Sequence, residues 1–208
     1  MYNLFAVFRE MFGRRVRVFE MHGTACSDCA LALELQNEIV TVTKEIEDAP
    51  CFPPHVTLLP DIPRSEYEVL TAAKHLAATL EPFQVDFERV ASGHAFFQCV
   101  YLLVAREPKI LDAWRAACEA CGLPARPGEY MPHLSLVYAD IPEDQRRKMA
   151  STIHGKLFAV PGGVRDGFVA DTIAVMRTPA DDRTLSSWKM VGEVRLVDRS
   201  KEGCGEGA

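Results

Sequence analysis

Residues Phe52–Pro63 read FPPHVTLLPDIP, and residues Tyr130–Pro142 read YMPHLSLVYADIP. Each segment holds a proline, a histidine, an apolar residue, a hydroxyl residue and a leucine in the same order. Each closes on Asp-Ile-Pro, one residue later in the second copy. Two copies of one frame predict a duplicated unit that contributes one histidine from each half. His55 and His133 are therefore the candidate active-site pair.

The spacing inside each segment has a structural consequence. In extended chain, alternate side chains point to the same face. His55 therefore lies beside Thr57, and His133 lies beside Ser135. Each motif predicts an imidazole and a hydroxyl that face one pocket.

The order of elements around the motifs repeats as well. Helical periodicity of apolar residues predicts a helix before each motif, at Asp28–Glu47 and at Pro108–Cys121. After each motif we expect a helix, a strand, a turn and a strand. These are Ser65–Leu80, Phe83–Val90 and Ala95–Val104 in the first half, and Glu143–His154, Val164–Met176 and Ser186–Val197 in the second. The predicted fold is α+β, with two antiparallel sheets backed by helices, related by a pseudo-two-fold axis, and an active-site cleft between them.

The expected domain limits follow from this repeat. The duplicated domain covers residues 15–197, and the polar, Gly-rich residues 198–208 form a flexible tail. Residues 1–14 form an N-terminal extension, because Arg15–Met21 alternates polar and apolar residues and predicts the first strand. The apolar residues of Met1–Arg15 fall on one helical face. They predict a terminal helix packed on the body, or a targeting segment.

Within the helix Ser65–Leu80, the sequence predicts an N-terminal cap and a buried face. Ser65 and Glu68 have the spacing of a capping box, which satisfies free N–H groups at a helix start. The apolar periodicity places Tyr67 on the buried face with Leu76. Gly122 is the expected stop of the helix Pro108–Cys121.

Composition restricts the partners of this chain. It has 208 residues, a formal charge of -6 and a pI of about 5.5. Affinity for long nucleic acid comes mainly from Lys and Arg on phosphates, so we expect a small phosphate-bearing substrate and no long nucleic acid. No apolar run approaches the roughly 18 residues of a membrane span. We expect a cytoplasmic monomer, with a mitochondrial location as the alternative if Met1–Arg15 is a targeting segment.

The seven cysteines are odd in number and follow no secretory signal, which favours reduced thiols. Cys26 and Cys29 form one Cys-x-x-Cys pair, and Cys118 and Cys121 form another. A four-cysteine zinc site or a redox dithiol is the alternative. Both pairs lie at or within predicted helices, however, so we expect buried or surface thiols, no metal and no cofactor.

Two imidazoles across a cleft can divide proton transfer between them. Histidine titrates near neutrality, so one ring can act as general base and the other as general acid. Two neighbouring hydroxyls can hold the non-bridging oxygens of a phosphodiester while negative charge builds on them. The pattern predicts attack of water on a phosphodiester without a metal ion.

The residues also resemble a known family. The paired His-x-Thr and His-x-Ser strands are similar to those of the two-histidine (2H) phosphoesterase superfamily. Three segments resemble the plant and yeast type of cyclic phosphodiesterase: Ser92–Val100 (SGHAFFQCV), Tyr130–Tyr138 (YMPHLSLVY) and Thr184–Trp188 (TLSSW). With the first motif, they span residues 54 to 197 of the chain.

That resemblance implies an activity. Members hydrolyse 2′,3′-cyclic nucleotides to nucleoside 2′-phosphates. They also open ADP-ribose 1″,2″-cyclic phosphate, a by-product of tRNA splicing, to ADP-ribose 1″-phosphate. Alternatives are RNA-end processing or 2′,5′-phosphodiester cleavage within the same superfamily, and a nucleotide-binding regulatory module.

The resemblance also implies the site residues. His55 and His133 are catalytic, and Thr57 and Ser135 bind the phosphate. Tyr138 lines the substrate pocket, with Phe97 and Trp188 as further substrate-binding aromatics; ordinary core packing is the alternative for Trp188. The sequence leaves open which histidine is base and which is acid, and the resemblance favours His133 for activating the water. The loop 122–129 differs in length from the family pattern, so substrate preference can differ.

Overall fold

The computed structural model describes residues 1–7, 27–126, 128–159, 164 and 167–199. The strands are β1 (Tyr2–Val7), β2 (Val56–Ile62), β3 (Phe83–Val85), β4 (Phe87–Ser92), β5 (Val100–Val104), β6 (His133–Val137), β7 (Phe168–Ala170), β8 (Thr172–Arg177) and β9 (Lys189–Arg195). The helices are α1 (Ser27–Thr43), α2 (Glu66–Thr79), α3 (Pro108–Ala120), α4 (Glu143–Phe158) and the 3-10 turn η1 (Phe96–Gln98).

The strands form two antiparallel sheets. The larger sheet has the order β4-β5-β6-β2-β1-β8-β9, and the smaller one joins β3 to β7. The two motif strands, β2 and β6, meet at the middle of the large sheet, where Val56 pairs with Leu134. This junction divides the sheet into two lobes, which we call lobe 1 (β2, β1, β8, β9) and lobe 2 (β6, β5, β4). The predicted α+β fold with two lobes is confirmed.

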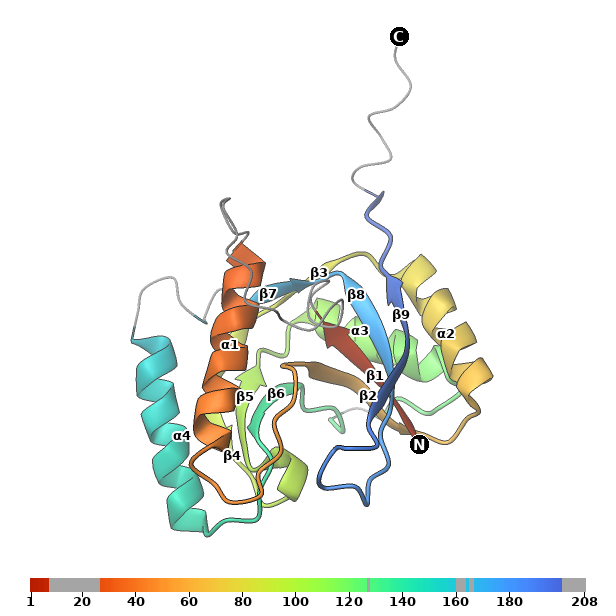
Figure 1. Ribbon diagram of the computed structural model, residues 1–208. Helices are drawn as coiled ribbons and strands as arrows, with labels where there is room; N and C mark the ends of the chain where they lie inside the picture. Colours follow the sequence, from red (N-terminus) through yellow and green to blue (C-terminus); the bar gives the residue numbers. More distant parts are fainter. Residues whose placement is uncertain (8–26, 127, 160–163, 165–166, 200–208) are drawn as a thin grey trace, which may run out of the picture.

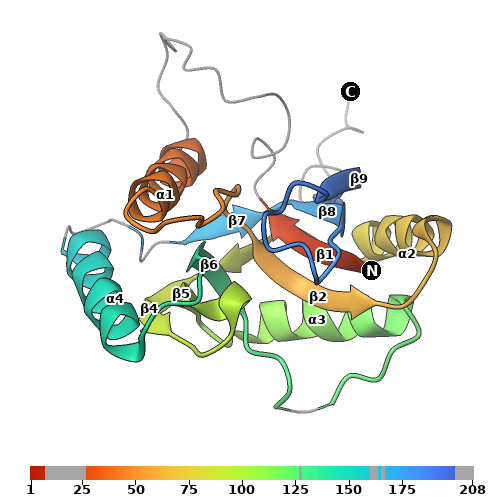
Figure 2. The ribbon, with the colours of Figure 1, turned by 60° about the horizontal axis from the view of Figure 1, so that its bottom comes forward.

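The internal repeat is visible in the contacts between elements. The order β1-α1-β2-α2-β3-β4 recurs as β5-α3-β6-α4-β7-β8, and β9 lies outside the repeat. Helix α2 packs against β8 as α4 packs against β4, and α3 packs against β2 as α1 packs against β6. Helices α1 and α4 lie on one side of the molecule, and α2 and α3 on the other (Figure 1). Figure 2 shows α3 beneath β2, with β5 and β6 alongside.

The helix predicted over the N-terminal segment is wrong for the described part of that segment. Residues Tyr2–Val7 form strand β1, which pairs with β2 on one side and with β8 on the other. Leu4 and Ala6 enter the main core, while Phe5 and Val7 form a second apolar cluster on the opposite face. A strand buried on both faces is apolar at every position, and this pattern also fits a helical face. The described part of the predicted helix is therefore a strand, Tyr2–Val7.

Two other predicted strands are divided. The segment Phe83–Val90 breaks at Asp86 into β3 and β4, which belong to different sheets. The corresponding segment of the second half breaks at Asp171 into β7 and β8 in the same way. Ala95–Val104 is a strand only from Val100, because Phe96–Gln98 forms η1. Each of the first two segments is therefore two short strands, and the third is a 3-10 turn followed by a short strand.

The helix details are mostly confirmed. The capping box of α2 is present, with both the Ser65 side chain and the Glu68 side chain engaged. Gly122 follows α3 with a φ of 63°. Tyr67 was expected to be buried but is 79% exposed, because the packed face of α2 runs through Val69, Ala73 and Leu76.

Some predictions lie outside the described residues. These are the strand Arg15–Met21 and the tail from residue 200 to the end. Among the described residues, no helix is both long enough and apolar enough to cross a membrane.

Candidate active site

A cavity of about 360 Å³ opens where the two lobes meet. It brings together all seven residues that the sequence predicted for the site. Its lining residues are Asn3, Phe5, His55, Thr57, Pro60, Asp61, Phe97, Gln98, Glu129, Tyr130, Met131, His133, Ser135, Tyr138, Thr178, Ala180 and Trp188. The side chains come from both motif strands, from β1, from η1 and from the segment between β8 and β9.

The two imidazoles are held in the same way. The Nδ1 atom of His55 lies 2.8 Å from the carbonyl oxygen of Pro53. The Nδ1 atom of His133 lies 2.9 Å from the carbonyl oxygen of Met131. A carbonyl can only accept a hydrogen bond, so Nδ1 carries the proton in each ring. The Nε2 atom of each neutral ring therefore keeps a lone pair that can accept a proton.

The surroundings of the two rings differ. His55 is 4% exposed, and the ring of Phe5 stacks on it with centroids 3.9 Å apart and an interplanar angle of 18°. The hydroxyl of Tyr138 lies 3.4 Å from Nε2 of His55. His133 is only half-buried, and Tyr101 meets its ring edge-on at 5.1 Å. Residues Phe5 and Tyr101 occupy equivalent places, because they pair with Thr57 and Ser135 respectively.

Burial lowers the pKa of both histidines. Desolvation lowers the pKa of His55 to about 4, opposed by its hydrogen bond to Pro53 and assisted by the nearby charge of His133. Desolvation also lowers the pKa of His133, again opposed by its backbone hydrogen bond. Both rings are therefore neutral in the empty site at neutral pH. A protonated ring needs a nearby negative charge to stabilise it.

The two hydroxyls are not equivalent either. Ser135 donates its hydroxyl to the carbonyl of Phe97 at 3.0 Å. The hydroxyl of Thr57, by contrast, has no hydrogen-bond partner among the described residues. Tyr130 donates to the backbone carbonyl of Thr57 at 3.0 Å, which fixes the strand that carries it. Thr57 can therefore donate to a ligand oxygen without breaking an existing bond.

Three aromatic side chains form one wall of the cavity. Tyr138 meets Phe97 edge-on at 5.2 Å and lies 6.2 Å from Trp188. Phe97 and Trp188 lie 5.8 Å apart. Behind this wall, Phe52 stacks on Tyr138 at 3.9 Å. Trp188 packs partly on the apolar clusters and also lines the cavity, and its contact with a substrate stays a prediction.

Several lining residues were missed from the sequence. Phe5 and Asn3 alternate along β1, but the helical interpretation of the N-terminal segment concealed this period of two. Asp61 belongs to the closing Asp-Ile-Pro, a pattern that assigned it no place in the site. Thr178, which follows β8 directly, carried no motif, and nothing in a single sequence would have indicated its role.

The cysteines that the structure describes are reduced. Cys51, Cys99, Cys118 and Cys121 are free thiols. Burial raises the pKa of Cys121 to about 11, and it also raises the pKa of Cys118. Both thiols are therefore poor nucleophiles and poor metal ligands at neutral pH. Within the described residues, no group of three or more His, Cys, Asp or Glu side chains is arranged to hold a metal ion. Cys26 and the side chain of Cys29 lie outside the described part.

Comparisons with known proteins indicate one family. The model of the family "Cyclic phosphodiesterase-like protein" matches residues 25–202. A cyclic phosphodiesterase of Arabidopsis thaliana is 29% identical over 150 residues, which cover 71% of this chain and 79% of that protein.

Solved structures show the same fold at lower identity. The E. coli LigT structure complexed with 3′-AMP has a TM-score of 0.54 and 12% identity, over 95% of this chain and 98% of that one. The LigT structure complexed with NADP+ has a TM-score of 0.52 and 13% identity, over 95% and 97% of the two chains. Together with the match over most of its length, the fold and the paired motifs show that this chain belongs to the cyclic phosphodiesterase-like family of two-histidine phosphoesterases.

Proposed function

We propose that this protein hydrolyses small cyclic phosphodiesters of nucleotides: 2′,3′-cyclic nucleotides to 2′-phosphates, ADP-ribose 1″,2″-cyclic phosphate to ADP-ribose 1″-phosphate, or both. The observation that carries the proposal is the pair of imidazoles that line one cavity, each with Nδ1 fixed to a backbone carbonyl. This arrangement leaves two Nε2 atoms for proton transfer. The name of the Arabidopsis relative supports a cyclic substrate.

The chemistry follows from the arrangement. The phosphoryl group would lie between the two rings, with its non-bridging oxygens on the hydroxyls of Thr57 and Ser135. One neutral imidazole takes a proton from water as the water oxygen bonds to phosphorus. The other, protonated, gives its proton to the ester oxygen as the bond from phosphorus to that oxygen breaks. The negative charge of the phosphodiester raises the pKa of a neighbouring imidazole, so substrate binding itself favours the protonated acid.

The surroundings of the rings favour His55 as the base and His133 as the acid. Burial, the stacked Phe5 and the hydroxyl of Tyr138 all favour an uncharged His55. A single proton shared by the pair therefore resides on the more exposed His133. This order is opposite to the one that the family resemblance favours.

Turnover of cyclic nucleotides tests the function directly. The purified protein should hydrolyse 2′,3′-cyclic NMPs or ADP-ribose cyclic phosphate, and EDTA should leave the rate unchanged. His55→Ala and His133→Ala should each lose about 10²- to 10⁴-fold in kcat, the usual contribution of a positioned acid or base. Full activity in both variants would refute the proposal. Turnover of oligonucleotides alone would instead favour RNA-end processing, and tight binding without turnover would favour a regulatory module.

A thio-substituted substrate separates the two roles. When sulfur replaces the leaving oxygen at the 3′ position, the thiolate departs without a proton from the enzyme. The variant that lacks the acid should recover activity on this substrate, whereas the variant that lacks the base should not. Recovery is expected for His133→Ala; recovery for His55→Ala would establish the reverse assignment.

A further inference from the structure

The cavity extends beyond the catalytic pair along β1. Asn3 is two residues from Phe5 on the same face of this strand, and both line the cavity. Asp61 donates its backbone N–H to Oδ1 of Asn3 at 2.9 Å. Thr178 lies next to them, since its N–H donates to the carbonyl of Met1 at 3.2 Å. Asn3, Asp61 and Thr178 therefore form a polar end of the cavity.

This polar end has hydrogen-bonding capacity that the described residues do not use. Oδ1 of Asn3 is occupied, which leaves its Nδ2 as a donor. Asp61 has a φ of 54°, a conformation that costs free energy for a residue other than glycine. Its exposed carboxylate has no partner among the described residues.

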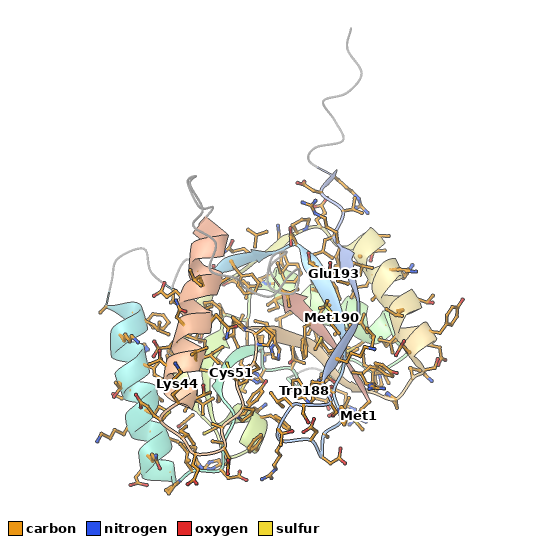
Figure 3. All side chains as sticks on the ribbon, viewed as in Figure 1. Met1, Lys44, Cys51, Trp188, Met190 and Glu193 are labelled. Carbon is orange, nitrogen blue, oxygen red and sulfur yellow. The ribbon has the colours of Figure 1, made fainter. Side chains whose placement is uncertain are left out.

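Two buried polar atoms next to this end are also unpaired. Oγ1 of Thr178 has no hydrogen-bond partner in the described structure, although this residue is only 3% exposed. Nε1 of Trp188, in the same cavity lining, lacks a partner as well. Unpaired buried polar groups are costly, and each therefore needs an explanation. Trp188 directly precedes β9, and Met190 lies within that strand (Figure 3). A ligand at this end of the cavity would be next to both atoms.

The other lobe is closed at the equivalent place. Phe5 corresponds to Tyr101, so Asn3 corresponds to Cys99, which is fully buried. There, η1 covers the strand, and Ser135 is hydrogen-bonded to the carbonyl of Phe97. Along lobe 1 the cavity therefore reaches Asn3, whereas the equivalent residue of lobe 2, Cys99, is buried and does not line it. The part of the substrate that extends from the phosphate has room on the lobe 1 side.

We propose that Asn3, Asp61 and Thr178 form a subsite that selects adenine and cytosine by their exocyclic amino groups. This inference rests on the proposed function. Two residues of strand span about 7 Å, comparable to the ribose that separates a cyclic phosphate from its base. The base would then lie against Trp188 with its edge toward Asn3 and Asp61.

The hydrogen-bonding groups at the edge of the nucleobase determine which bases this subsite selects. An ionised carboxylate only accepts hydrogen bonds, and the Nδ2 group of an amide only donates them. The amino groups of adenine and cytosine donate, and the ring nitrogen beside each accepts, which complements Asp61 and Asn3. Uracil places a carbonyl oxygen where cytosine has its amino group. That oxygen would face the carboxylate of Asp61, so the subsite rejects uracil by repulsion as well as by a lost bond.

Two cyclic pyrimidine nucleotides test the inference, because they differ at this group and have nearly the same size. The wild-type protein should show a kcat/KM for 2′,3′-cyclic CMP about tenfold or more above that for 2′,3′-cyclic UMP. In Asp61→Asn, whose amide can donate or accept, the ratio should fall to near one while turnover continues. Asp61→Ala should also lose the preference, because the cytosine substrate binds more weakly without the carboxylate. The matched control is Asp181→Asn, which removes an exposed charge that does not line the cavity and should keep the wild-type ratio.

The outcomes separate this inference from the proposed function. Equal kcat/KM values in the wild type, or a preference that survives in Asp61→Ala, would overturn the subsite while both substrates are still hydrolysed. If neither nucleotide is hydrolysed, the proposed function fails, and calorimetric binding of 2′-CMP and 2′-UMP decides the subsite. Tighter binding of 2′-CMP that is lost in Asp61→Ala would support it, and equal binding would refute it.

Discussion

Two motifs of the same pattern place their histidines in different surroundings. Both rings bind a carbonyl two residues before them, which is a consequence of the motif itself. Their exposure and aromatic neighbours come from other strands: Phe5 from β1 and Tyr101 from β5. The local sequence therefore sets the orientation of each ring, and the partner strand sets its pKa.

The pH dependence of kcat/KM should show this effect. Catalysis needs one neutral and one protonated ring, and kcat/KM reports the pKa values of the free enzyme. We expect a bell-shaped profile that describes the coupled pair, with an acid limb near the pKa of about 4 for His55. The alkaline limb should lie below the ordinary histidine value, because burial lowers the pKa of His133 too. The profile of kcat should be displaced to higher pH, since the bound phosphodiester stabilises the imidazolium.

A variant at Phe5 checks the cause of the low pKa. Phe5→Ala opens one face of the His55 ring to water, which reduces the desolvation of its charged form. The acid limb of kcat/KM should move to higher pH, while the alkaline limb from His133 should move little. A profile that is unchanged in Phe5→Ala, or a wild-type maximum above pH 7, would contradict this account.

At the scale of elements, the segment between β8 and β9 positions Trp188. The carboxylate of Asp182 accepts hydrogen bonds from the N–H groups of Thr184 and Ser187, at 3.0 and 2.7 Å, and from both hydroxyls at 2.6 Å. These bonds hold the pKa of Asp182 well below its usual range. Trp188 follows directly, and its backbone N–H donates to the carbonyl of Leu185 at 3.0 Å. One acidic side chain therefore organises the turn that carries an aromatic wall of the cavity.

Removal of that carboxylate should affect binding more than chemistry. In Asp182→Ala, the turn loses its hydrogen bonds, and Trp188 is no longer held against Phe97. We expect KM for a cyclic nucleotide to rise about fivefold, which corresponds to about 1 kcal/mol, with kcat nearly unchanged. Steady-state kinetics measure both quantities, and Asp181→Ala at the exposed neighbouring position is the control. A fall in kcat at constant KM would show that the turn acts on the reacting groups instead.

The sequence predicted the site better than its surroundings, for physical reasons. A histidine two residues from a hydroxyl is a local pattern, and its meaning depends only on the period of a strand. The prediction therefore placed His55, Thr57, His133 and Ser135 in one cavity. The role of β1 depends on burial by strands from the other end of the chain, and no local period shows that. Because β1 was not predicted, Phe5 and Asn3 were missed as lining residues of the cavity. For the same reason, the predicted repeat differed by one strand from the observed one.

At the scale of the molecule, strands of the two halves pair at four places: β1 with β8, β4 with β5, β2 with β6 and β3 with β7. The motif strands meet at Val56 and Leu134, and β3 pairs with β7 in the small sheet. Gly167 lies immediately before β7 with a φ of 56°, and a Cβ atom there would be 1.8 Å from the carbonyl oxygen of Val85. The β3–β7 junction therefore depends on the lack of a side chain at this glycine, because the backbones of the two halves approach closely there.

Substitution of Gly167 tests how much this junction contributes to stability. Gly167→Ala should lower the free energy of unfolding by about 2 kcal/mol or more, because the backbone of β3 has to move and the positive φ is strained. The control is Gly155→Ala on α4, where a Cβ atom meets nothing within 4 Å. That change should stabilise the protein by up to about 1 kcal/mol through helix propensity. Denaturant unfolding of both variants measures the contrast. If both glycines tolerate alanine equally, the small sheet is not a close junction between the halves.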